Sequence, residues 1–91
     1  VAITGRGNSP NVLRAGEWAN EQGATTIGLT GFDGGKLAGL ARHAMIAHSH
    51  LMPLVEDVHI AVCHGLAVTL GAMIAEEHLL FEPTRLRTQA A

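Results

Sequence analysis

The chain has 91 residues, of which 47% are hydrophobic and 3% aromatic, and its formal charge is -2 with only six Lys and Arg residues. This length limits the chain to one small core, and the shortage of basic residues argues against a nucleic-acid ligand. An interior of Ala, Val, Leu, Ile and Gly suits helices packed on a sheet, so the composition favours an α/β fold.

The longest strongly apolar stretch, residues 60–75, is interrupted by His64, Gly65 and Gly71. It falls short of the roughly 20 uninterrupted apolar residues that span a bilayer, so no membrane partner is expected. Cys63 is the single cysteine, which excludes an internal disulfide, and no charged-then-apolar leader is visible. We therefore expect a cytoplasmic protein.

The first predicted unit is a strand, a loop and a helix. Residues 1–3 have the character of the end of a buried strand, and they run directly into a glycine-containing loop, so we expect the chain to begin inside a domain. Ser9 is a suitable N-cap, Pro10 fits the first helical position, and apolar residues then recur at helical spacing up to Gly23. This pattern predicts a helix of about three turns.

Residues 25–30 are rich in β-branched side chains and predict a second buried strand. A turn at residues 33–35 leads into a helix over residues 36–41, and residues 44–47 predict a third strand. After a loop at residues 48–52, Pro53 opens a long apolar helix that ends near residue 78, and a polar tail occupies residues 83–91. This alternation predicts a three-layer α/β/α fold with a parallel sheet and right-handed crossovers.

The loop at residues 4–9, Thr-Gly-Arg-Gly-Asn-Ser, has the composition of an anion site. A strand that passes directly into a helix presents free backbone N–H groups and the positive end of the helix dipole. Thr4 and Ser9 add hydroxyl donors, while Gly5 and Gly7 let the backbone approach an anion closely. We therefore predict a phosphate site at the carboxyl end of the first strand.

Two alternatives stay open for this loop. Asn8, Ser9 and Pro10 by themselves also form an ordinary turn and helix cap. Arg6 either pairs with a phosphate bidentately or faces solvent. The later glycine-rich segment is better explained as a turn that leads into a helix, because Asp33 would repel an anion.

Three motifs follow one another in the chain. They are Ile-Thr-Gly-Arg-Gly-Asn-Ser-Pro-Asn-Val at residues 3–12, Ile-Gly-Leu-Thr-Gly-Phe-Asp-Gly-Gly-Lys-Leu-Ala-Gly-Leu-Ala at residues 27–41, and Val-Glu-Asp-Val-His-Ile at residues 55–60 with His64 beyond. In this order they resemble SIS (sugar isomerase) domains over residues 1–71, and the phosphoheptose isomerases are the most similar group. The resemblance implies that residues 1–82 are the C-terminal half of a flavodoxin/Rossmann-like SIS domain.

The same resemblance implies an activity and its partners. The family isomerises sedoheptulose 7-phosphate to D-glycero-D-manno-heptose 7-phosphate, usually as a homotetramer and often with zinc. Thr4, Gly5, Arg6 and Ser9 fall where the family contacts its phosphorylated sugar. The family usually has hydroxyl residues at the positions of Gly5 and Arg6, so this chain loses hydroxyl contacts there and gains a guanidinium.

Glu56 and His64 lie eight residues apart on the predicted long helix, which corresponds to about 12 Å along the axis and about 80° around it. Both side chains could reach a metal or a substrate hydroxyl between them, and carboxylate with imidazole is a usual zinc ligand pair. Alternatively, Glu56 is a first-turn acid favoured by the helix dipole and His64 is a hydrogen-bonded core histidine.

The resemblance favours the functional interpretation of this pair. In phosphoheptose isomerases the matching positions hold a glutamine and a histidine that contact substrate and metal, which implies catalytic, substrate-binding and metal-binding roles for Glu56 and His64. We expect His64 to exchange protons during enediol formation, since imidazole titrates near neutral pH. A carboxylate in place of the amide at residue 56 is expected to retain a divalent cation more strongly.

The other candidate ligands are predicted to lie outside the site. No recognised ligand spacing links the remaining histidines, of which His59 is the least certain exclusion, and Cys63 is predicted to be a core residue. The remaining histidines are His43, His48, His50, His59 and His78.

Three functions fit these features. The first is a phosphosugar isomerase with the residues named above. The second is a non-catalytic SIS regulator that binds a sugar phosphate, or an adaptor for a replication initiator. The third is an inactive piece, because the family takes further metal ligands and a catalytic glutamate from an earlier helix. We expect the chain alone to be inactive, and to be unstable or to associate.

Overall fold

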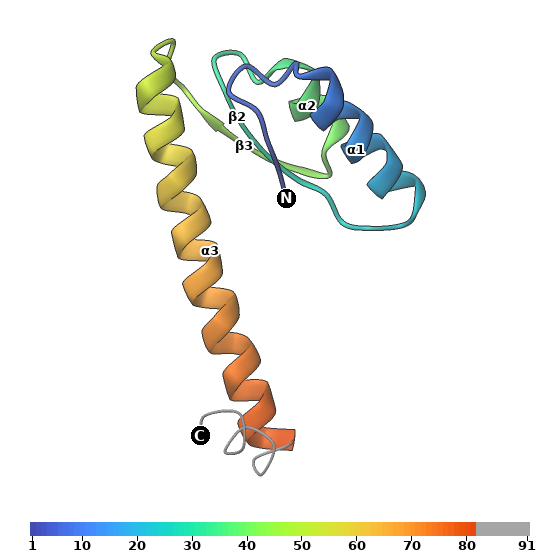
Figure 1. The fold of residues 1–91 in the computed structure, drawn as a ribbon, viewed down its shortest axis with the longest axis vertical. Coiled ribbons are helices and arrows are strands. Elements are labelled where there is room, and N and C mark those ends of the chain that lie inside the picture. The colour runs from blue at the N-terminus through green and yellow to red at the C-terminus, as the bar shows by residue number, and fades with distance from the viewer. Residues whose placement is uncertain (82–91) are drawn as a thin grey trace. The chain divides into compact units, whose positions relative to one another are not determined.

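Three short parallel strands form a sheet in the order β1-β2-β3 (Figure 1). In the computed structural model, which describes residues 1–81, the strands are β1 (Ala2–Ile3), β2 (Ile27–Gly31) and β3 (His43–Ala47). Helix α1 (Pro10–Glu21) connects the first two strands, α2 (Gly35–Leu40) connects the second and third, and α3 (Met52–Phe81) follows β3. The predicted polar tail at residues 83–91 lies outside the described residues.

The chain divides into two units, Val1–Ile60 and Ala61–Ala91, so α3 begins in the first and continues in the second. The sheet, α1, α2 and the first turns of α3 belong to the first unit.

The predicted elements are confirmed in type and order, with small shifts at their ends. Helix α3 ends at Phe81 instead of near residue 78, and β2 begins at Ile27 instead of residue 25. Thr26 lies outside the strand, and its side chain makes two hydrogen bonds. The hydroxyl donates to the Asn20 side-chain oxygen over 2.8 Å and accepts the Arg42 backbone N–H over 2.9 Å. The residue therefore ties the end of α1 to the start of β3.

Helices cover both faces of β2, which confirms the three-layer architecture for the first unit. A Cβ atom added to Gly28 would lie 3.0 Å from the Leu37 side chain on α2, whereas one added to Gly31 would lie 2.5 Å from Val55 on α3. Positions 28 and 31 point to opposite faces because strand residues alternate. Leu29, Leu37 and Val55 are at most 1% exposed and form the centre of this small core.

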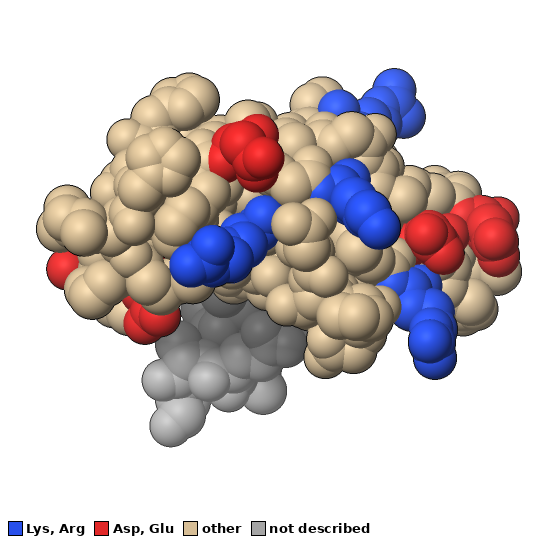
Figure 2. All heavy atoms as spheres, turned by 90° about the horizontal axis from the view of Figure 1, so that it is seen from above, with Lys and Arg blue, Asp and Glu red and all other residues tan. Residues whose placement is uncertain are grey.

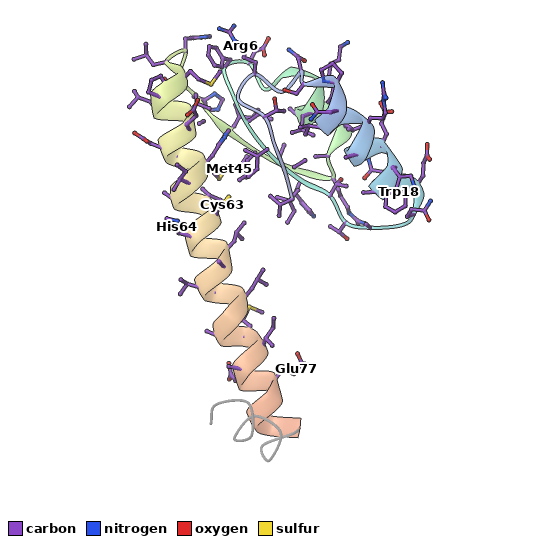
Figure 3. The ribbon with its side chains drawn as sticks, viewed as in Figure 1. Arg6, Trp18, Met45, Cys63, His64 and Glu77 are labelled. Atoms are coloured by element: carbon purple, nitrogen blue, oxygen red, sulfur yellow. The ribbon has the colours of Figure 1, made fainter. Side chains whose placement is uncertain are left out.

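Two apolar residues of the first predicted unit are exposed. Ile3 is expected in a buried strand, but it is 44% exposed because, within residues 1–81, β1 pairs only with β2. Trp18, one of the apolar residues that recur at helical spacing in the first helix, is 64% exposed (Figure 3). Helix α1 packs through Gly16 instead, where an added Cβ would lie 2.9 Å from the Leu40 side chain. This close approach leaves Trp18 outside the contact.

Helix α3 has 30 residues and is apolar on nearly every side. Among its apolar residues Val55 is fully buried, whereas Val58 and Leu70 are 41% and 53% exposed. Residues Met52–Glu77 are long and apolar enough to cross a membrane, by length and composition only, and 6% of their apolar window is buried. The absence of a membrane partner therefore stays a prediction.

Candidate functional site

The phosphate loop, residues 4–9, connects β1 to α1. The Thr4 N–H donates to the Leu29 carbonyl over 3.1 Å, which continues the sheet pairing by one residue, and the Gly7 N–H donates to the Thr4 carbonyl over 3.2 Å. The second bond closes a tight turn. The loop is thus fastened to the carboxyl end of β2, where ligands bind in parallel α/β sheets.

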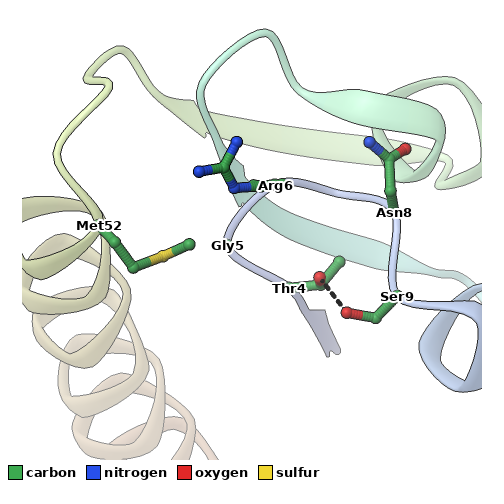
Figure 4. A pocket seen from close by; sticks show the side chains of 6 residues that line it. All are labelled: Thr4, Gly5, Arg6, Asn8, Ser9 and Met52. Atoms are coloured by element: carbon green, nitrogen blue, oxygen red, sulfur yellow. Dashed lines mark hydrogen bonds between the residues drawn. The ribbon is translucent and has the colours of Figure 1, made fainter.

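Ser9 occupies the N-cap position of α1, as predicted, but its hydroxyl makes no capping hydrogen bond. The Ser9 Oγ lies 2.7 Å from the Thr4 Oγ1 instead, as the dashed line in Figure 4 marks. Pro10 at the first helical position has no N–H to satisfy. The free N–H groups of the first turn and the paired hydroxyls therefore make this end of the loop a suitable place for an anion.

A hollow of about 270 Å³ opens beside the loop, and all four predicted phosphate residues line it. Its lining is Thr4, Gly5, Arg6, Asn8, Ser9 and Met52. Met52 was not predicted, and its side chain reaches from α3 toward Gly5 (Figure 4). A Cβ at residue 5 would lie 2.5 Å from the Met52 sulfur, so the thioether occupies the space that a hydroxyl side chain at residue 5 would need.

Backbone-to-backbone packing holds the phosphate loop against the turn before α2. Gly7 has φ 78° and Gly35 has φ 59°, both in the left-handed region, and a Cβ on either residue would collide with the backbone of the other segment. The Gly7 carbonyl accepts the Leu37 N–H over 2.9 Å. Glycine is required at both positions by this close approach and by the backbone conformation.

The segment around Asp33 is a turn that leads into α2, as predicted. The Asp33 Oδ1 accepts the Gly35 N–H over 3.0 Å, and the Lys36 N–H donates to the Asn8 Oδ1 over 2.9 Å. These N–H groups at the start of α2 are therefore already bonded. Asn8, which the sequence analysis treated only as a turn residue, joins the two loops.

Arg6 is exposed, which is consistent with one of its two predicted alternatives. Its guanidinium carbon lies 4.4 Å from the centroid of the Phe32 ring, a cation–π contact. The Phe32 ring in turn meets the His50 ring edge-on, with centroids 5.5 Å apart and planes at 70°. Arg6 is exposed, yet it is held beside the phosphate loop by this stack.

Glu56 and His64 are both exposed on α3, and each predicted structural alternative for them is wrong. Helix α3 begins at Met52 and has no acidic residue in its first turn, so Glu56 is not stabilised as a first-turn acid. His64 is exposed and is not a core histidine (Figure 3). Glu56 belongs to the unit Val1–Ile60 and His64 to the unit Ala61–Ala91, so the position of each residue is described relative to its own unit.

Within residues 1–81 no group of three or more His, Cys, Asp or Glu side chains could hold a metal ion. Zinc sites in proteins use at least three protein ligands. Glu56 and His64 supply two, so the donor set of the described residues does not by itself fit a zinc ion.

His59 was excluded from the site, but it has a defined structural role. It is 4% exposed, and its Nε2 lies 2.7 Å from the Thr30 carbonyl oxygen. This bond joins the second turn of α3 to the end of β2. Its spacing of four residues from Val55 is the signal that places it on the buried face of the helix. Cys63, predicted as a core residue, is half-buried.

Acidic and basic side chains are interspersed on the surface drawn in Figure 2, and neither sign forms a large patch on this face. The site therefore depends on the local groups of the phosphate loop and not on a large field of one sign.

Comparison with known proteins identifies several phosphoheptose isomerases as relatives. A phosphoheptose isomerase of Nitratidesulfovibrio vulgaris is 39% identical over 83 residues, which cover 91% of this chain and 40% of the relative. A phosphoheptose isomerase of Aquifex aeolicus is 38% identical over 76 residues, covering 84% of this chain and 40% of the relative. One from Trichlorobacter lovleyi is 46% identical over 66 residues, or 72% of this chain and 34% of the relative.

No family model matches the chain. The chain spans about two fifths of the length of the curated relatives that it matches. The resemblance drawn from the three motifs is nevertheless confirmed: over most of its own length, this chain is a sequence relative of the phosphoheptose isomerases.

Proposed function

We propose that this chain supplies the phosphate-binding part of an aldose–ketose isomerase that acts on a phosphorylated sugar, with sedoheptulose 7-phosphate as the substrate and D-glycero-D-manno-heptose 7-phosphate as the product. The observation that carries the proposal is the Thr4 and Ser9 hydroxyl pair beside the uncapped start of α1. The names of the relatives support the choice of sugar.

The phosphate would lie against Thr4 and Ser9, where hydroxyl and backbone N–H groups donate to its oxygens. Gly5 lets the backbone approach, and Arg6 supplies a positive charge at the rim of the hollow. Holding the phosphate orients the rest of the sugar, which lowers the entropic part of the barrier for proton transfer.

For the reacting end of the sugar we retain His64 as the residue that exchanges protons during enediol formation, and Glu56 as a substrate contact. These two assignments rest on the resemblance and on side-chain chemistry. A zinc ion that uses Glu56 and His64 is likewise a proposal, and it requires at least one further ligand. A homotetramer and a cytoplasmic location are proposed on the resemblance and on the sequence composition.

The decisive experiment measures isomerisation of sedoheptulose 7-phosphate by the full-length protein. We expect Ser9→Ala to raise KM about tenfold with kcat largely retained, because it removes binding to a part of the substrate that does not react. We expect His64→Ala to lower kcat by about 100-fold or more. Glu17→Gln, an exposed change on α1, is the control for both.

The outcomes separate the candidate functions. A wild-type protein that binds the sugar phosphate without isomerising it would favour the regulator or adaptor function. A His64→Ala protein with full turnover would contradict the role of His64, and loss of turnover after removal of divalent metals would support the metal proposal. If the protein binds neither inorganic phosphate nor the sugar phosphate, the proposed phosphate site is wrong.

A further inference from the structure

A second hollow shares two lining residues with the first, Arg6 and Asn8, whose side chains project from the same side of the phosphate loop (Figure 4). Its volume is also about 270 Å³, and its lining is Arg6, Asn8, Phe32, Asp33 and His50. Because Arg6 and Asn8 line both hollows, a ligand larger than phosphate can extend from one into the other. Asp33 and His50 line only this second hollow and not the one beside Thr4 and Ser9.

The second hollow offers a defined set of donors and one strong acceptor. The Asn8 Oδ1 accepts the Lys36 N–H, so the amide NH₂ of Asn8 remains as the donor. The Asp33 Oδ1 accepts the Gly35 N–H, and its second carboxylate oxygen accepts no hydrogen bond from residues 1–81. The Arg6 guanidinium adds further donors, and the His50 ring can donate or accept.

Contacts between the side chains hold this set in place. The Phe32 ring contacts both the Arg6 guanidinium and the His50 ring. Phe32 itself has φ 54°, a conformation that no other non-glycine residue within residues 1–81 adopts, and its N–H donates to the Ser49 carbonyl over 3.1 Å. Such conformations persist where surrounding contacts hold them, and they are frequent at ligand sites.

We propose that the second hollow binds the hydroxyl-bearing part of the sugar whose phosphate lies at Thr4 and Ser9. Neighbouring sugar hydroxyls each donate one hydrogen bond and accept others, which matches a free carboxylate oxygen beside amide and guanidinium donors. A second phosphate fits less well, because the Asp33 carboxylate would repel it. The inference rests on the proposed phosphosugar function and adds Asp33 and His50 as residues that recognise the sugar.

The test compares dissociation constants for inorganic phosphate and for sedoheptulose 7-phosphate, measured by calorimetry on the full-length protein. Asp33→Asn retains the oxygen that accepts the Gly35 N–H and replaces the free carboxylate oxygen with a donor. We expect Asp33→Asn to reduce the preference for the sugar phosphate over phosphate about tenfold, with phosphate affinity within about twofold of wild type. His50→Ala is expected to reduce the same preference about threefold.

His48→Ala is the matched control, since His48 is exposed near His50 and does not line the hollow. An unchanged preference in both Asp33→Asn and His50→Ala would overturn the sugar subsite and leave the phosphate site standing. Equal affinity of the wild type for phosphate and the sugar phosphate would also overturn it. A wild-type protein that binds neither ligand would overturn the subsite together with the proposed function.

Discussion

The phosphate loop and helix α3 differ in how many of their groups are bonded to or buried by neighbouring residues. The loop is held by hydrogen bonds to β2 and α2 and by close glycine contacts, all within the unit Val1–Ile60. Helix α3 is apolar on nearly every side, yet most of its side chains are exposed. A helix that is apolar all round is normally buried or spans a membrane. The loop therefore has its structural contacts within one unit, whereas the apolar side chains of the helix with the proposed catalytic residues remain exposed to solvent.

The largest expected effect concerns the exposed surface of α3. Val68 and Met73 are 73% and 59% exposed, and burying two such side chains contributes about 3 to 6 kcal/mol to association. We expect the 91-residue chain to self-associate and the double variant Val68→Glu, Met73→Glu to be mostly monomeric in sedimentation velocity. Thr69→Glu, on the same helix, is the control. A monomeric wild-type chain would show that α3 needs no cover.

The next effect concerns the close approach of the two glycine loops. Gly7→Ala places a Cβ against the Gly34 carbonyl at a positive φ, so we expect a loss of about 3 kcal/mol in the free energy of unfolding. Urea denaturation measures this loss. Gly39→Ala is the matched control, because its Cβ would contact nothing within 4 Å and it should raise stability by up to about 1 kcal/mol. Equal effects of the two changes would contradict the described loop packing.

A smaller effect is expected at the contact between α3 and β2. His59→Leu removes the hydrogen bond to the Thr30 carbonyl from a buried position, which should lower the free energy of unfolding by about 2 kcal/mol. His64→Leu, at an exposed position on the same helix, should change it by less than about 0.5 kcal/mol. If both variants unfold at the same denaturant concentration, the His59 hydrogen bond to Thr30 does not stabilise the contact between α3 and β2.

The smallest effect concerns the support of Arg6 by Phe32. Phe32→Leu removes the ring under the guanidinium and should weaken phosphate binding about threefold, in line with a cation–π contact of about 0.5 to 1 kcal/mol. Phe32→Tyr keeps the ring and should bind phosphate as the wild type does. A Phe32→Leu protein with unchanged affinity would mean that the stack does not position Arg6 for the anion.

Local patterns in the sequence were sufficient for the order and type of the elements. Pro10 after Ser9, the β-branched residues before Gly31 and the long apolar segment after Pro53 each have one favoured backbone state. The same patterns placed the loop of Thr4 to Ser9 at the carboxyl end of β1, because that location follows from topology alone.

Burial and side-chain partners were less predictable. Trp18 and Ile3 are exposed although both are apolar, because exposure depends on which neighbours are present and not on residue type. The Met52 thioether over Gly5 and the ring stack of Phe32 and His50 join residues far apart in the chain, and no local pattern contains such pairs. Whether Glu56 lies in the first turn of α3 depends on the residue at which the helix starts. The helix starts at Met52, which leaves Glu56 beyond the first turn.

The sequence therefore determined an α/β chain with an anion-binding loop at a helix start, since backbone preference and hydrophobic spacing are local properties. Tertiary contacts decided the rest. They turned the Ser9 hydroxyl toward Thr4 instead of the helix, stacked Arg6 on Phe32, and brought Asp33 and His50 beside the phosphate loop. These arrangements arise only when the loops after β1, β2 and β3 meet at one edge of the sheet, because a parallel sheet gathers the carboxyl ends of its strands there.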